Sequence, residues 1–66
     1  MGKMLEYRTL IEDKTKNMGA EAFKVKGAIG LKAGIMILSI DANTPDDPAI
    51  VQAMKTAIKE VLGVTV

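Results

Sequence analysis

The acidic segment Asp41–Pro48, DANTPDDP, is the first place where side chains could do chemistry, by holding a cation. Its first three residues have the spacing of a calcium-binding loop, and Asp46 and Asp47 add two carboxylates. The later positions depart from that loop, because proline, aspartate and glutamine stand where an oxygen ligand, a glycine and a bidentate glutamate are needed. An aspartate directly before Pro48 is instead typical of a helix start. We therefore predict no metal site.

A second group that could bind a ligand is the GxxG sequence Gly27–Gly30, which lies among Lys24, Lys26 and Lys32. Loops of this pattern clamp the backbone of single-stranded nucleic acid in some RNA-binding domains. The segment lacks the helix–loop–helix context of such loops, and no arginine lies near it. Turn glycines and a solvated lysine face explain the same residues. Nucleic-acid binding by the three lysines is kept as the alternative function.

The composition argues against enzymatic chemistry. The 66 residues include no cysteine and no histidine, so the chain has no thiolate nucleophile, no disulfide and no imidazole proton carrier. The glycines match neither the dinucleotide nor the P-loop spacing. Nine basic and eight acidic residues leave a net charge of +1, which by itself indicates neither nucleic acid nor an anionic membrane as a partner. We predict that the protein is not an enzyme and uses no cofactor.

The central stretch Phe23–Asp41 has two interpretations. As a β-hairpin, its first half alternates apolar residues with Lys24 and Lys26, GLKAG forms the turn, and the isoleucine-rich run Ile35–Ile40 forms the second strand. As a helix, it would carry three glycines, each costing about 1 kcal/mol relative to alanine. The propensity cost favours the hairpin. A helix, which would need close contact along its glycine face, stays as the alternative.

The flanking segments have the patterns of amphipathic helices. Residues from Lys3 to about Met18 carry apolar side chains at helical spacing, with an end near Asp13 as the alternative because six polar residues follow Ile11. Ala49–Leu62 has one continuous apolar face followed by Gly63. The tail Val64–Val66 has the propensity of a short third strand. The predicted fold is therefore a single α+β domain over residues 1–66, helix–β-hairpin–helix with this short C-terminal strand. The alternative is an all-α arrangement of three helices.

The predicted hairpin leaves apolar side chains without partners. The second strand would place apolar residues on both faces, whereas two helices in a chain of this length can cover only one. We therefore expect a non-enzymatic interaction or assembly module that forms homo-oligomers. Binding to another protein is a further possibility. The chain shows no signal peptide and no membrane span, so we expect a cytoplasmic protein. The residues predicted to self-associate are Ile35, Met36, Ile37, Leu38 and Ile40.

Overall fold

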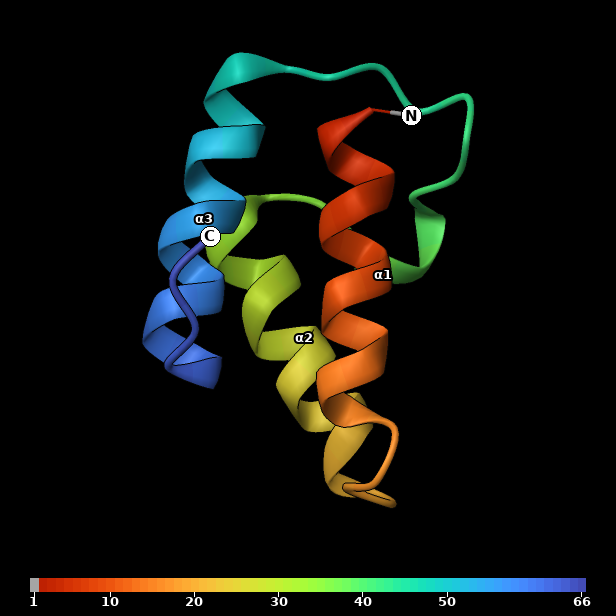
Figure 1. The fold of residues 1–66 in the computed structure, drawn as a ribbon, viewed down its shortest axis with the longest axis vertical. Coiled ribbons are helices and arrows are strands. Elements are labelled where there is room, and N and C mark those ends of the chain that lie inside the picture. The colour runs from red at the N-terminus through yellow and green to blue at the C-terminus, as the bar shows by residue number, and fades with distance from the viewer. Residues whose placement is uncertain (1) are drawn as a thin grey trace.

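A computed structural model describes residues 2–66 and contains three α-helices (Figure 1). Helix α1 spans Lys3–Thr15, α2 spans Glu21–Ala33 and α3 spans Pro48–Leu62, and a short 3-10 helix, η1, spans Ile37–Ser39. The described residues contain no strand, so the predicted α+β fold with a β-hairpin is wrong and the all-α alternative fits. The tail predicted as a third strand, Val64–Val66, is irregular.

The prediction for residues 23–34 failed because their buried side chains repeat at helical spacing. Val25, Ile29 and Ala33 recur every four residues on the inner face of α2, and Ile29 is completely buried. Gly34 is not inside the helix, because it ends α2 in the left-handed conformation, with φ 76°. Only two glycines lie in the helix interior, at a cost of about 2 kcal/mol. Burying Ile29 alone offsets most of that cost.

The run Ile35–Ile40 does not form a strand, because its buried residues are three apart. Ile37 and Ile40 point into the core, whereas Met36 and Leu38 face outward. The segment meets its backbone hydrogen-bonding needs without a sheet, since the Ile40 N–H donates to the Ile37 carbonyl at 3.2 Å. The Arg8 guanidinium of α1 donates to the carbonyls of Leu38 and Ile40. These contacts fix η1 against α1.

Helix α3 confirms the prediction for the C-terminal segment. It begins at Pro48 after Asp47, whose carboxylate accepts a hydrogen bond from the Ala49 N–H at 2.9 Å. Gly63, with φ 71°, ends it. Helix α1 stops at Thr15, between the two predicted ends, so that Lys16 and Asn17 lie outside it.

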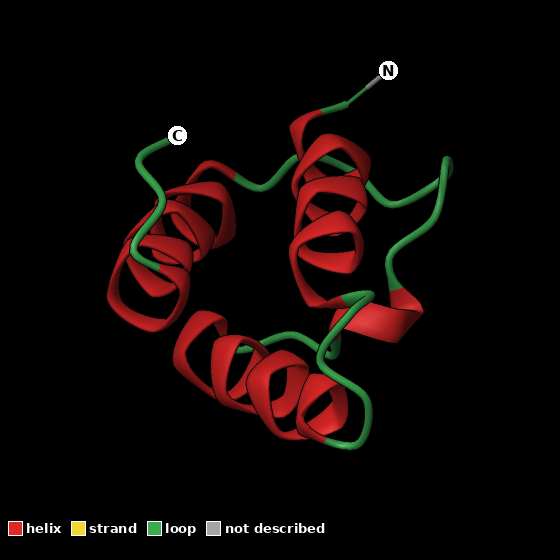
Figure 2. Cartoon of the chain, turned by 60° about the horizontal axis from the view of Figure 1, so that its bottom comes forward, coloured by secondary structure: helices red, strands yellow, loops and turns green. Residues whose placement is uncertain are grey.

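The core lies where the three helices face one another (Figure 2). Helix α2 packs most extensively on α3, and η1 closes the core beside α1 and α2. No helix within residues 2–66 combines the length and the apolar character needed to cross a membrane. The buried hydrophobic residues are Met4, Tyr7, Ile11, Ile29, Ala33, Ile37, Ile40, Met54, Ala57 and Ile58.

Asp46, one of the carboxylates of the acidic segment, contacts the start of α1. Its carboxylate accepts hydrogen bonds from the backbone N–H groups of Lys3, at 3.0 Å, and Met4, at 3.1 Å. Asp46 therefore closes the N-terminus of a helix that is more than 40 residues away in sequence. These two hydrogen bonds, with the positive charges of the N-terminus and Lys3, lower the pKa of Asp46 below its ordinary value of 3.8.

Candidate functional site

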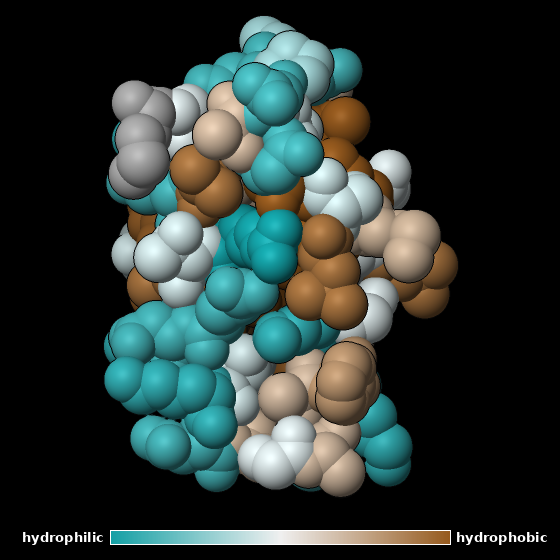
Figure 3. All heavy atoms as spheres, turned by 90° about the vertical axis from the view of Figure 1, so that its right-hand side faces the viewer, coloured by the Kyte–Doolittle hydropathy of each residue, from teal (hydrophilic) through white to brown (hydrophobic). Residues whose placement is uncertain are grey.

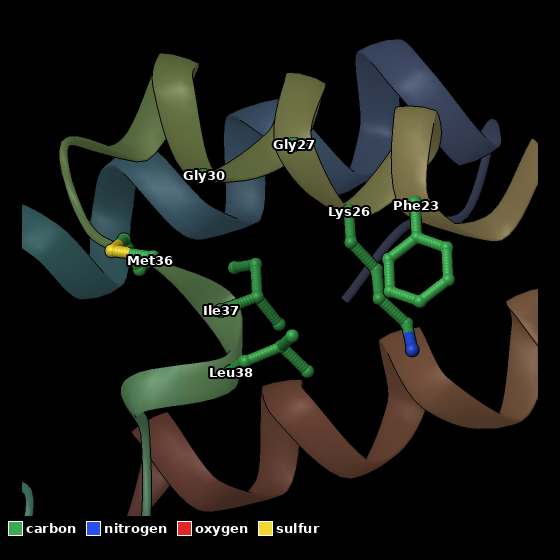
Figure 4. A pocket seen from close by; sticks show the side chains of 7 residues that line it. All are labelled: Phe23, Lys26, Gly27, Gly30, Met36, Ile37 and Leu38. Atoms are coloured by element: carbon green, nitrogen blue, oxygen red, sulfur yellow. The ribbon is translucent and has the colours of Figure 1, made fainter.

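An apolar groove runs between α2 and the segment that follows it (Figure 4). It encloses about 190 Å³ and continues along α2 past Leu31 to Gly34. In Figure 4, Phe23 and Lys26 stand at one end of the groove and Met36 at the other. We call the whole hollow the α2 groove; its lining residues are Phe23, Lys26, Gly27, Gly30, Leu31, Gly34, Ile35, Met36, Ile37 and Leu38.

Two glycines of the α2 groove are required by the fold. Gly34 turns the chain back on itself with a positive φ, and its N–H donates to the Gly30 carbonyl at 2.8 Å. The returning chain passes so close to α2 that a Cβ at Gly30 would lie 2.6 Å from the Ile35 carbonyl oxygen. Glycine at these two positions therefore brings residues 35–38 alongside the helix.

Gly27 differs from these two glycines because nothing in the single chain requires it. It lies exposed in the interior of α2, and a Cβ there would meet no atom within 4 Å. Its conformation is helical, so any L-residue could adopt it. An exposed glycine in a helix interior costs about 1 kcal/mol relative to alanine. That cost has no compensation within the described residues.

Large apolar side chains surround the groove and are mostly exposed. Leu31 is 86% exposed, Met36 74%, Phe23 72% and Leu38 51%. The other exposed large hydrophobic residues of the described chain, Met18 and Val66, are less exposed, at 39% and 37%, and neither lines the groove. On the side of the molecule that carries α1 and η1, hydrophilic residues gather at the lower left, whereas hydrophobic residues lie on the right and at the upper left (Figure 3). The four most exposed large apolar side chains of the described residues therefore all lie around the groove.

The residues predicted to self-associate divide between this surface and the core. Met36 and Leu38 lie exposed in the groove, Ile35 is half-buried, and Ile37 and Ile40 are buried. The prediction missed Phe23 and Leu31 on α2. Their spacing from Gly27, four residues on each side, could have indicated one helix face had the helical interpretation been followed.

The three lysines predicted for nucleic-acid contact do not form one face. Positions 24 and 26 of a helix point about 200° apart, so the shared strand face that the hairpin implied is absent. Lys24 pairs with Glu21 at 3.6 Å, and Lys32 pairs with Glu60 of α3 at 3.0 Å. Lys26 extends toward α1 along the edge of the groove (Figure 4). The single lysine face that the hairpin implied is therefore replaced by three lysines that point in different directions.

The acidic segment acts in local structure. The Asp41 carboxylate accepts hydrogen bonds from the Asn43 N–H at 2.8 Å and from the Thr44 hydroxyl at 3.3 Å, which makes a turn. Asp46 and Asp47 each cap a helix. Within residues 2–66, no three acidic side chains come together in a way that could hold a metal ion.

Comparison with protein-family models, curated proteins and solved structures finds no match for this chain. The functional proposal therefore rests on the geometry of the α2 groove.

Proposed function

We propose that this protein is a non-enzymatic interaction module that self-associates through the α2 groove. The observation that carries the proposal is the concentration of four mostly exposed large side chains, Phe23, Leu31, Met36 and Leu38, around one hollow. Covering these side chains removes apolar surface from water, at about 25 cal/mol per Å². The groove has the concave, largely apolar character of sites that accept another apolar surface.

Two features support protein rather than nucleic acid as the partner. The lining of the groove is apolar except for Lys26, and two of the three lysines around it are already paired with carboxylates. Binding to phosphates depends on several free cations acting together. A titration with labelled single- and double-stranded oligonucleotides at low salt tests the alternative function, and binding that weakens steeply with added salt would favour it.

The experiment for self-association is sedimentation equilibrium across a dilution series. The wild-type chain is compared with a double variant, Phe23→Gln with Leu31→Gln, whose side chains lie outside the core. Removing two large apolar contacts should raise the dissociation constant at least about tenfold, since tenfold corresponds to only about 1.4 kcal/mol. Circular dichroism verifies that the double variant keeps its helices.

Met18→Gln is the matched control, because Met18 is also partly exposed but lies outside the groove. It should associate as the wild type does. A wild-type chain that stays monomeric at high micromolar concentration would count against self-association. The cytoplasmic location expected from the sequence remains part of this proposal, and cell fractionation tests it.

A further inference from the structure

The outer face of α2 has a pattern that is symmetric about Gly27. Phe23 lies four residues before Gly27 and Leu31 four residues after it, so a large side chain stands about 6 Å along the helix on each side of the glycine. Both large residues fall within about 40° of the direction of Gly27 around the helix axis. The order of side chains along this face is therefore large, small, large in either direction.

Such a face is complementary to itself when two copies are related by a two-fold axis. An axis that passes beside Gly27 would make the two α2 helices antiparallel and place Phe23 of each copy beside Leu31 of the other. The absence of a side chain at position 27 would let the helices approach closely at their crossing point. An interface of this kind uses the same patch on both copies, which is the commonest arrangement in homodimers.

The uncovered area fits a second copy of the chain. A fully exposed large apolar side chain presents on the order of 200 Å², so Phe23, Leu31, Met36 and Leu38 together offer roughly 500 Å² on one copy. Stable interfaces bury about 800 Å² per partner, and these four residues would supply more than half of that. The net charge of only +1 adds little repulsion between copies.

We infer that the protein forms a two-fold dimer in which antiparallel α2 helices cross at Gly27, with Phe23 of each copy packed on Leu31 of the other. This inference rests on the proposed self-association and adds its geometry. It also explains the glycine at position 27, which nothing in the single chain requires. In the dimer, Gly27 lies where the two copies approach each other most closely.

Disulfide cross-linking tests the geometry directly, because the chain has no cysteine of its own. In Gly27→Cys the two thiols would face each other across the axis, within the separation that a disulfide spans. Under mild oxidation this variant should cross-link on the order of tenfold faster than Gln52→Cys, an exposed control on α3, because its thiols are held at high effective concentration. Equal rates for the two variants would overturn the crossing at Gly27.

The direction of the helices is tested by mixing two single-cysteine variants, Phe23→Cys and Leu31→Cys. The antiparallel arrangement predicts that the mixed disulfide forms in preference to either symmetric one. Preferential formation of the symmetric disulfides would overturn it. Gly27→Leu supplies a measurement without cysteine: its side chain has open space in the single chain but blocks close approach, so the dissociation constant should rise at least about tenfold with helicity retained.

The oligomeric mass of the wild-type protein in solution distinguishes self-association from the proposed antiparallel crossing. A dimer in which the Gly27→Cys chains do not cross-link faster than the control would overturn the antiparallel crossing and leave self-association in place. A wild-type monomer at all concentrations, without accelerated cross-linking, would overturn both.

Discussion

The two faces of helix α2 differ in whether the single chain covers them. The inner face places Ile29 and Ala33 in the core, with Val25 packed beside them. The outer face carries Phe23, Gly27 and Leu31, and none of these three is buried. Both faces are apolar, so composition does not distinguish the side that folds the monomer from the side left uncovered. Only the inner face has an opposing surface within the chain.

Substitutions on the two faces should have unequal effects on monomer stability, and this is the largest difference we expect. Ile29→Ala removes a completely buried side chain and should lower the free energy of unfolding by about 3 kcal/mol. Leu31→Ala, on the outer face, should change it by less than about 0.5 kcal/mol. Urea denaturation at a protein concentration that favours monomers measures both.

A large loss of stability for Leu31→Ala under these conditions would contradict the distinction between the faces. It would mean that the outer face contributes to folding of the isolated chain.

The two interior glycines of α2 also distinguish the faces, because replacing them with alanine should change the stability of the monomer in opposite directions. Gly30→Ala should destabilise the monomer by about 1–3 kcal/mol, since its Cβ would meet the Ile35 carbonyl oxygen and force the returning chain away. Gly27→Ala should stabilise it by about 0.5–1 kcal/mol, since nothing opposes the added methyl group. Thermal and urea denaturation of the two variants, compared with the wild type, give the sign of each effect.

Loss of stability in both variants would show that Gly27 is also required by the single chain. Its proposed role between copies would then lose its main support.

The smallest effect concerns the contact between Asp46 and the start of α1. Because folding lowers the pKa of this carboxyl group, the contact stabilises the fold above the ordinary value of 3.8 and is lost as the pH falls through the lowered pKa. Asp46→Asn keeps an oxygen acceptor but removes the charge. The variant should be slightly less stable at neutral pH, and the difference from the wild type should shrink below about pH 4. Melting temperatures between pH 2 and 7 measure this.

Asp13→Asn is the control for that titration, because Asp13 is an exposed acidic residue near the other end of α1. A difference between Asp46→Asn and wild type that stays constant with pH would argue against a charge-dependent cap.

Local chemistry in the sequence was sufficient for helix α3. An aspartate cap, a proline at the first helical position, a continuous apolar face and a closing glycine all lie within one segment, and the structure has each of them. Residues 23–34 lacked such agreement, because strand alternation and helical spacing can both be found among the same glycines and lysines. There the packing of Ile29 and Ala33 against the rest of the core selected the helix.

Which residues of the groove are exposed also depended on whether the middle of the chain formed a strand or a helix. Met36 and Leu38 were predicted as part of an interacting segment, and they lie in the groove, but Ile37 and Ile40 of that segment are buried. A strand would have exposed alternate residues, whereas the turn at Gly34 followed by η1 buries residues three apart.

The sequence by itself determined the bounds of α3, the absence of cysteine and histidine, and a surplus of apolar residues in the middle of the chain. Only the tertiary structure decided that the middle is helical, that Arg8 holds the backbone of residues 38 and 40, and that Asp46 caps α1. The physical reason is one of distance along the chain. Caps and helix faces depend on neighbours a few residues away, whereas these contacts join residues 30 to 43 positions apart and form only once the helices have packed.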